Sequence, residues 1–515
     1  MSKSIARAAF VIMIMNIVSR LLGFGRETVI AYEYGATFLT DAYLVAYTIP
    51  YFLQSVLGLA LVSSIVPVIT RHLVKGDEEE AWKIASITMN WTVLFMSILT
   101  VLGMAGAWFL VKLTAPGFDQ TTAQLATRLT LIMFPSVIFM GAGMLITGIL
   151  NARKSFAVPA FAPAFSALII ILAVLTVGYL GIEYLAWGTL ASFLGSLLIQ
   201  LPSLKRVGFK YKWAWSLAHP EVKGIFLNLL PIFIGTAVNQ IYLAINRIFA
   251  SGLAEGSISA LNYAGKLMNM PMGIFALAIS TAIFPTLSEQ AVGNNKDALA
   301  GTLLKGLRMV LLVTLPSAAG LMALRYPVVK LLFERGVFDA IATQMTADSL
   351  FYFCIGMFAM AGNMVLTRAY YAVGDVKTPL YLGLISIGVN VAASFAFIPL
   401  LGHSGLALAN SLASIFSFLA MLGVLIRRLT SFRISALLLS TVKSLIASVC
   451  CALVAGFVSN KLAGPLRGLG TKGLLVEVVL AVVIGVVIYG LIIVLTKEEE
   501  TREILQTLTR KIGRS

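Results

Sequence analysis

Long apolar runs separated by short polar connections make up almost the whole chain. A membrane-spanning helix needs roughly 20 apolar residues to cross about 30 Å of hydrocarbon, and many runs reach that length. Because lipid offers the backbone no hydrogen-bond partners, such runs are expected to be helices rather than open strands. The pattern predicts an all-α, polytopic integral membrane protein with about fourteen transmembrane helices. The predicted spans lie near 8–32, 41–70, 82–111, 122–150, 157–180, 184–202, 222–250, 257–287, 299–325, 342–370, 378–400, 404–426, 436–460 and 473–496.

Composition excludes a soluble protein. Of 515 residues, 59% are hydrophobic and 12% are charged, against roughly 45–50% and 25% in soluble domains. The net charge of +16 would suit nucleic acid, but the basic residues lie in short connections between spans, so no nucleic-acid partner is predicted. Cys354, Cys450 and Cys451 lie inside apolar runs, and their spacing suggests neither a disulfide framework nor a metal site.

The distribution of basic residues predicts the orientation in the membrane. The connections that follow even-numbered spans carry Arg71, Lys75, Arg153, Lys154, Lys205, Arg206, Lys210, Lys212, Arg427, Arg428 and Arg433. Fewer bases lie on the opposite side, chiefly around 325–335 and 461–472. The positive-inside rule therefore predicts that this multi-pass inner-membrane protein has both termini in the cytoplasm.

The chain also contains an internal repeat. Asp119 and Asp339, like Pro159 and Pro379, are 220 residues apart in similar contexts. The repeat predicts two pseudo-symmetric six-helix bundles, an N-terminal lobe at 1–215 and a C-terminal lobe at 216–432. Spans 13 and 14 and a cytoplasmic tail make up 433–515. The tail, 497–515, is predicted to form a surface helix.

Ionisable residues within spans are costly in lipid and normally face a cavity. Arg20 lies near the middle of the first span, and Gly23 and Gly25 precede Arg26 and Glu27. The planar guanidinium fork fits phosphate oxygens in pairs, so Arg20 and Arg26 suit a phosphate or pyrophosphate group. On a regular helix the two point about 120° apart, so we expect a glycine break to bring them together. The alternative for Arg26 is an anchor at the end of the span.

Polar residues of the second, seventh and eighth spans complete the candidate site. Asp41 is predicted to pair with Arg20 or Arg26 when the cavity changes state, or to act as a simple helix N-cap. Arg247 lies late in the seventh span. Ser259, Asn262 and Lys266 share one stripe of the eighth span at spacings of three and four. Alternatively, the side chains of Arg247 and Lys266 extend to the membrane surface and take no part in binding.

Enzyme motifs are absent from the sequence. His72, His219 and His403 are isolated, no metal-binding spacing or P-loop occurs, and Gly23-Phe24-Gly25 lacks the rest of a nucleotide fingerprint. We therefore predict a transporter rather than an enzyme, with no cofactor.

Several stretches resemble one known family. They are NIVSRLLGFGRETVIAYEYGA, TDAYLVAYTIP, LNARKSFAVPAFAPAF, SISALNYAGKLMNMPMG and RAYYAVGDVKTP. Together they are similar to the MurJ (MviN) lipid II flippases of peptidoglycan synthesis, in the multidrug/oligosaccharidyl-lipid/polysaccharide exporter superfamily. The resemblance runs from about residue 5 to residue 430.

The resemblance implies a central cationic cavity for the pyrophosphate-sugar head group and a groove beside the last two helices for the polyprenyl tail. Arg20, Arg26, Asp41 and Ser259 match residues of the family's site. The family often has arginines at the positions of Gln54 and Lys266. Some members bind sodium near spans 7, 11 and 12, where this chain has Asn246 and Asn390 with no acidic ligand beside them.

The resulting hypothesis is alternating access, in which lipid II passes from the inner to the outer leaflet with the membrane potential as the drive. Lipid II and membrane lipids are the predicted partners, with cell-wall synthesis proteins as further candidates. The alternatives are another undecaprenyl-linked oligosaccharide or a multidrug cation as cargo, a membrane glycosyltransferase, and a non-transporting scaffold.

Overall fold

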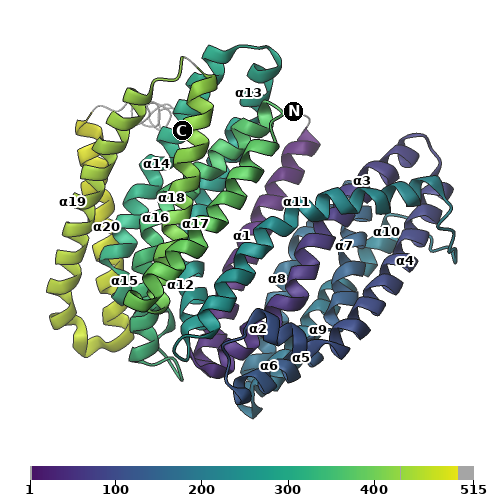
Figure 1. Cartoon of the computed structure of the whole chain (residues 1–515), viewed down its shortest axis with the longest axis horizontal. Helices are drawn as coiled ribbons and strands as arrows, with labels where there is room; N and C mark the ends of the chain where they lie inside the picture. The colour runs from purple at the N-terminus through teal and green to yellow at the C-terminus, as the bar shows by residue number, and fades with distance from the viewer. Residues whose placement is uncertain (1–2, 430, 497–515) are drawn as a thin grey trace. The chain divides into compact units, whose positions relative to one another are not determined.

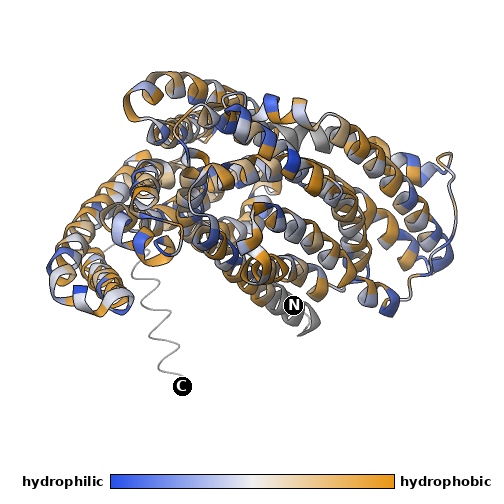
Figure 2. Ribbon diagram, turned by 90° about the horizontal axis from the view of Figure 1, so that it is seen from below, coloured by the Kyte–Doolittle hydropathy of each residue, from blue (hydrophilic) through white to orange (hydrophobic). Residues whose placement is uncertain are grey.

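The computed structural model describes residues 3–429 and 431–496. All regular elements in these ranges are helices and none is a strand, so the all-α prediction is confirmed. Figure 1 shows the helices in chain order, and Figure 2 shows that hydrophobic residues run along most of them. The surface helix predicted for 497–515 lies outside the described residues.

Every predicted span falls on one helix or on two or three consecutive helical elements. Within the described ranges, ten helical stretches are long and apolar enough to cross a membrane, or eleven if the bent pair α6 and α7 counts as one span. One of the ten, Ile434–Leu495, contains two of the predicted spans. The chain is therefore a multi-pass membrane protein, and the count of about fourteen crossings stays a prediction.

Contacts between helices divide the chain into two compact units. Unit 1 consists of Met1–Ser259 and Arg335–Phe338. Its helices are α1 (Lys3–Tyr34), α2 (Phe38–Leu53), the π-helix η1 (Gln54–Gly58), α3 (Leu59–Val74), α4 (Glu78–Ala105), α5 (Ala107–Thr114), α6 (Gln120–Met133), α7 (Ser136–Ala152), α8 (Ala157–Val177), the 3-10 turn η2 (Gly178–Leu180), α9 (Ile182–Leu198), α10 (Leu201–Arg206) and α11 (Pro220–Ser251). In this unit α1 packs on α8, α2 on α6, and α3 on α7 and α11.

Unit 2 consists of Ala260–Glu334 and Asp339–Ser515. Its helices are most of α12 (Ser257–Pro271), the π-helix η3 (Met272–Ala276), α13 (Leu277–Val292), α14 (Lys296–Ala323), α15 (Arg325–Phe333), α16 (Ala340–Ala372), α17 (Lys377–Leu401), α18 (His403–Arg428), α19 (Ile434–Leu466), the 3-10 turn η4 (Arg467–Leu469) and α20 (Gly470–Leu495). Here α18 packs on α16 and α17, while α19 packs on α14 and α20.

Helix starts follow from local chemistry. The Asp119 carboxylate accepts the backbone N–H groups of Thr121 and Thr122 at the start of α6, and Asp339 accepts that of Ala342 at the start of α16. Such caps satisfy amides that have no partner inside the helix. Asp119 and Asp339 are one of the pairs that revealed the internal repeat. They therefore have the same structural role in the two halves of the sequence.

The repeat predicted lobes with the boundaries 1–215, 216–432 and 433–515. These lobes are defined differently from the two units. The repeat compares sequence positions, whereas the units reflect contacts, and the contacts group α11 with the first half. The lobe boundaries stay a prediction.

Candidate functional site

The first helix corrects one prediction. We expected Gly23 and Gly25 to break the helix, but α1 is α-helical without interruption from Lys3 to Tyr34. Ser19 donates a hydrogen bond to the Ala160 carbonyl on α8, and a Cβ added to Gly25 would contact Ile171 of α8 at 3.8 Å. A Cβ added to Gly23 would meet nothing within 4 Å, so α1 packs on α8 as an unbroken helix without needing glycine at either position. Arg20 and Arg26 therefore lie on one regular helix, about 120° apart.

Arg26 is the more enclosed of the two arginines. Its side chain is 20% exposed, and Nη2 donates to Glu27 Oε1 at 2.5 Å. Its buried Nε has no hydrogen-bond partner among the described residues, whereas Arg20 is exposed. A buried donor without a partner is unusual in proteins and marks a position where an acceptor is expected. The guanidinium of Arg26 thus keeps capacity for an anionic group.

A tyrosine stack lines α2 near this guanidinium. Tyr43 and Tyr47 lie within electrostatic reach of Arg26. The ring centroids of Tyr43 and Tyr47 are 6.1 Å apart, and those of Tyr47 and Tyr51 are 5.5 Å apart. The Tyr43 hydroxyl hydrogen-bonds with that of Thr189 at 2.9 Å. The first turns of α2 are therefore held rigidly beside Arg26.

Asp41 caps a helix other than its own. The N-cap of α2 is Thr37, so the alternative of Asp41 as a simple N-cap is wrong. The Asp41 carboxylate instead accepts the N–H of Gly256 at 2.9 Å, the N–H of Ser259 at 2.8 Å and the Ser259 hydroxyl at 2.5 Å. These donors belong to the start of α12, whose orphan amides and positive dipole end favour a carboxylate. Asp41 thereby ties α2 to α12 across more than 200 residues of sequence.

In this conformation the hydrogen-bond partners of Asp41 are residues of the α12 start and not Arg20 or Arg26. Arg26 pairs with Glu27, and the hydrogen bonds of Asp41 go to α12. Arg247, late in α11, interacts electrostatically with both Asp41 and Glu27. Arg247 therefore belongs to the same charged group, in place of Arg20.

Close backbone approaches hold the neighbouring loops together. Gly256 has φ +80°, and a Cβ there would lie 2.2 Å from the Ala36 carbonyl oxygen. Gly336 has φ +61°, and its Cβ would lie 2.2 Å from the Tyr32 carbonyl oxygen. The N–H of Val337 donates to that Tyr32 carbonyl at 2.9 Å. Only glycine fits both the left-handed backbone and the space. The connections α1–α2, α11–α12 and α15–α16 thus form one tight seam.

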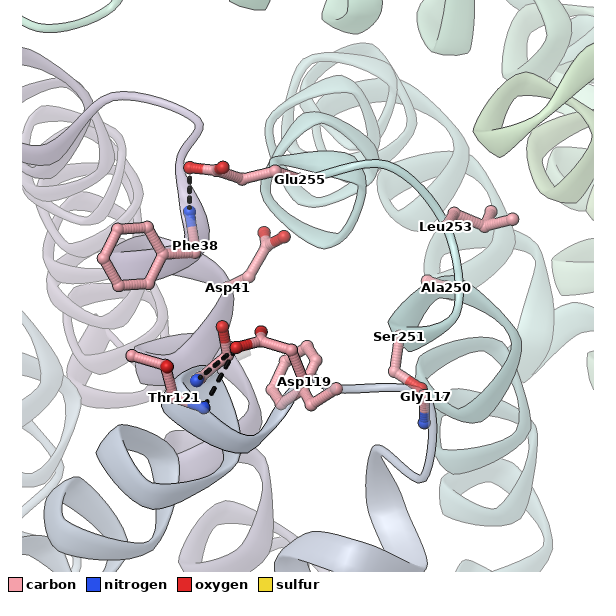
Figure 3. Close-up of a pocket in the computed structure, with 11 residues that line it drawn as sticks. Phe38, Asp41, Gly117, Asp119, Thr121, Ala250, Ser251, Leu253 and Glu255 are labelled. Carbon is pink, nitrogen blue, oxygen red and sulfur yellow. Dashed lines mark hydrogen bonds between the residues drawn. The ribbon is translucent and has the colours of Figure 1, made fainter.

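A cavity of about 420 Å³, lined by both polar and apolar residues, opens beside this seam in unit 1. Figure 3 shows Asp41, Asp119 and Glu255 around it. Glu255 accepts the N–H of Phe38 at 2.9 Å, and the N–H of Gly117 donates to the Ser251 hydroxyl at 3.1 Å. The carboxylates around the cavity thus cap backbone groups of the surrounding loops. The hydroxyl and amide donors of Thr122 hold the pKa of Asp119 below its usual value.

The other predicted residues lie on η1 and further along α12. Gln54 is the first residue of the π-helix η1 and is partly buried. Such bulges in membrane helices often mark functional positions. Asn262 and Lys266 follow Ser259 on α12 at the expected spacing but belong to unit 2. The Lys266 side chain is exposed.

The positions associated with sodium fit the ion only in part. Asn390 is fully buried, and neither its amide oxygen nor its amide nitrogen has a hydrogen-bond partner in the described part of the chain. An orphan amide oxygen is a suitable ligand for a hard cation. Asn246 instead donates to the Tyr242 carbonyl of its own helix. Within the described ranges, no group of three or more His, Cys, Asp or Glu is placed so that it could hold a metal ion.

Two contributors escaped the sequence analysis. Gly256 was overlooked, although a glycine directly before a Ser-rich helix start is a signal for a left-handed residue at that position. Tyr43 and Tyr47 were also overlooked, and their spacing of four residues would have placed them on one face of the second span.

Comparisons with known proteins support one assignment. Residues 30–465 match the family model "Lipid II flippase MurJ". The chain is 32% identical to the lipid II flippase MurJ of Burkholderia cenocepacia over 81% of this chain and 83% of that protein. It is 29% identical to a probable lipid II flippase MurJ of Bdellovibrio bacteriovorus over 97% and 96%.

Solved structures agree with this. A lipid II flippase MurJ in an inward closed conformation matches with a TM-score of 0.80 at 26% identity, covering 96% of this chain and 100% of that one. An inward-facing multidrug transporter of the MATE family matches with a TM-score of 0.66 at 16% identity, over 83% and 98%. The second likeness concerns the fold alone.

Proposed function

The chain belongs to the MurJ family of lipid II flippases, and on this basis we propose that it moves lipid II from the inner to the outer leaflet of the bacterial cytoplasmic membrane. It acts as a transporter and not as an enzyme. The observation that carries the proposal is the family match over residues 30–465. Both termini lie in the cytoplasm, as the basic connections favour.

Alternating access requires a connection that forms in one state and breaks in another. The contact of Asp41 with Gly256 and Ser259 has these properties, since it joins the start of α2 to the start of α12 through three short hydrogen bonds. When these bonds open, a carboxylate and several amide donors must find other partners. Water or the polar head group of the cargo can supply them, so opening of this contact is coupled to loading or release.

The pyrophosphate is bound by guanidinium and ammonium groups. Arg26 offers an unpaired Nε beside its contact with Glu27, and Arg20 lies on the same helix. Lys266 adds a point charge in this proposal, and Arg247 balances Asp41 and Glu27. Gln54 and Asn262 are neutral hydrogen-bonding groups with a secondary role. No resident cofactor takes part.

Membrane potential supplies the drive. Outward movement of about two net negative charges across an inside-negative membrane is favoured by roughly 4–5 kcal/mol per 100 mV. The sugar and phosphate groups cross through protein, while the polyprenyl tail stays in lipid.

The alternative function is export of a cation, because the fold also resembles that of a MATE-family multidrug transporter. A cation site should present unpaired acids. The acids near Arg26 are instead already used, since Glu27 pairs with Arg26 and Asp41 accepts three hydrogen bonds. We therefore favour an anionic cargo.

Complementation tests the proposal. Cells depleted of their own lipid II flippase should grow when they express this chain and should fail with Arg26→Ala at equal membrane abundance. Lys154→Gln, an exposed base far from α1 in sequence, is the matched control and should rescue. Full rescue by Arg26→Ala would remove the proposed site, and failure of the unaltered chain would remove the proposed function.

A further inference from the structure

The connection between α10 and α11 forms an unusual aromatic surface in unit 1. We call residues 207–219 the strap (Figure 1). Three of its aromatic side chains are largely open to the surroundings, with exposures of 49% at Tyr211, 77% at Trp213 and 39% at Trp215. The centroids of the two indole rings are 5.6 Å apart. Exposed aromatic clusters of this size are rare on protein surfaces in water and mark contact sites.

The strap is fixed along α4. The Lys212 N–H donates to the Ser86 hydroxyl at 3.0 Å, Asn90 donates to the Ala214 carbonyl at 2.9 Å, and the Trp91 indole donates to the Trp215 carbonyl at 3.0 Å.

The same strap begins near the end of that helix. The ring centroids of Phe209 and Trp82 are 5.6 Å apart. From Trp82 to Trp91 the helix rises by about 14 Å. Trp91 opens the continuous apolar stretch of α4 that follows Lys83 and Asn90, so Trp213 and Trp215 lie near the level at which this helix enters the lipid.

The charges at this end of unit 1 do not balance. Its acids are each engaged by a base of the protein, in the pairs Arg71–Glu221, Arg153–Glu78, Lys212–Glu79, Lys83–Glu80, His219–Glu80 and His72–Asp77. Lys205, Arg206 and Lys210 remain exposed, and no ion pair to them occurs in the described ranges. These three bases, two directly before the strap and Lys210 within it, are therefore free to attract an anionic group from outside the chain.

We propose that the strap, which includes Lys210, binds the headgroups of anionic phospholipids together with Lys205 and Arg206. Tryptophan and tyrosine prefer the level of the headgroups, where the ring lies in apolar surroundings and the N–H or O–H stays hydrated. Basic residues next to a membrane attract anionic lipids, and each strengthens binding several-fold. A soluble partner would not account for aromatic rings placed along the body of a membrane-spanning helix. The inference does not depend on the transported cargo.

Quenching of tryptophan fluorescence by brominated lipid tests the proposal. The full chain is reconstituted in vesicles of phosphatidylcholine and phosphatidylglycerol, with either lipid brominated at the same mole fraction. The signal of Trp213 and Trp215 is the difference between the unaltered chain and W213F/W215F. We expect brominated phosphatidylglycerol to quench this signal at least twofold more than brominated phosphatidylcholine.

A matched pair of charge variants isolates the cause. K205Q/R206Q/K210Q should lose the preference for phosphatidylglycerol. K461Q/R467Q/K472Q removes three exposed bases from another connection and should keep it. Equal quenching by both lipids in the unaltered chain would overturn the proposal, as would a preference that survives K205Q/R206Q/K210Q. Inorganic phosphate at 10 mM, about the upper physiological range, should leave the preference unchanged, and its loss would indicate a site for free phosphate instead.

Discussion

Two buried carboxylates in this protein are held in different ways. Asp41 in α2 is 4% exposed and Glu477 in α20 is 6% exposed. Asp41 accepts three hydrogen bonds at a helix start. For Glu477 the structure gives one, from the Ser459 hydroxyl of the neighbouring α19 at 2.6 Å. Both lie within helices predicted to cross the membrane.

This difference distinguishes a contact that can open during transport from one that only holds two helices together. Two of the three partners of Asp41 are backbone amides at the start of another helix, which water can satisfy when the contact opens. The partner of Glu477 is a side chain within the α19–α20 pair, which is surrounded by apolar residues such as Leu324, Ala455 and Ala481. Although the two carboxylates are almost equally buried, we therefore expect the loss of Asp41 to impair transport more than the loss of Glu477.

Removal of the Asp41 carboxylate should have the largest effect. Asp41→Ala loses three hydrogen bonds to a charged group, each contributing roughly 1.5–3 kcal/mol, and we expect at least a tenfold fall in flipping rate in reconstituted vesicles. Asp41→Asn keeps one carbonyl oxygen for Ser259, so its flipping rate should lie between those of Asp41→Ala and the unaltered chain. A normal rate in Asp41→Ala would show that this contact plays no part in the cycle.

Gly256→Ala should follow, because it displaces the same contact without touching its charges. The added Cβ would lie 2.2 Å from the Ala36 carbonyl oxygen, at a φ of +80° that alanine rarely adopts. Complementation should fail or need strong overexpression. Gly252→Ala is the control, since its φ is −90° and its Cβ would meet only the Phe249 carbonyl oxygen at 3.9 Å. Equal rescue by the two variants would argue against a tight seam.

Glu477→Ala should lower stability more than transport. It leaves the Ser459 hydroxyl without its acceptor, at a cost of about 1–3 kcal/mol. Thermal unfolding of the purified protein should show a lower midpoint, while flipping per folded molecule changes less than twofold. Glu477→Gln retains an acceptor and should be close to the unaltered chain. A loss of flipping in a stable Glu477→Gln would place this carboxylate in the transport cycle and end the contrast with Asp41.

Asp375→Asn should have the smallest effect on stability. Asp375 lies outside the membrane-spanning segments and serves as a reference. Hydrogen bonds from Thr378, together with Arg428, lower its pKa to about 2. Because the folded pKa is depressed from about 3.9, its stabilising contribution is full above pH ~4 and disappears as the pH falls towards 2. The melting temperatures of Asp375→Asn and the unaltered chain should differ slightly above pH 4 and converge near pH 2. A difference that grows below pH 4 would contradict this assignment.

Part of the candidate site could be predicted from sequence because its residue types are rare in lipid. Arg26, Asp41, Arg247 and Ser259 were all singled out, and the structure brings Asp41 together with Ser259 and with Arg247. Arg20 was predicted to join them through a glycine break. That break is absent because glycine permits a break without forcing one, and in lipid an unbroken helix keeps its backbone hydrogen bonds.

The sequence by itself determined where the helices lie and where several begin. Apolar runs must be helical in lipid because the backbone has no other partners, and Asp119 and Asp339 cap helices through residues two or three positions away. Only the tertiary structure decided which helix start Asp41 caps, how the strap runs along α4 and that Glu477 meets Ser459. These contacts join residues far apart in sequence or in different helices, and a pattern of apolar and polar positions carries no information about which partner lies opposite.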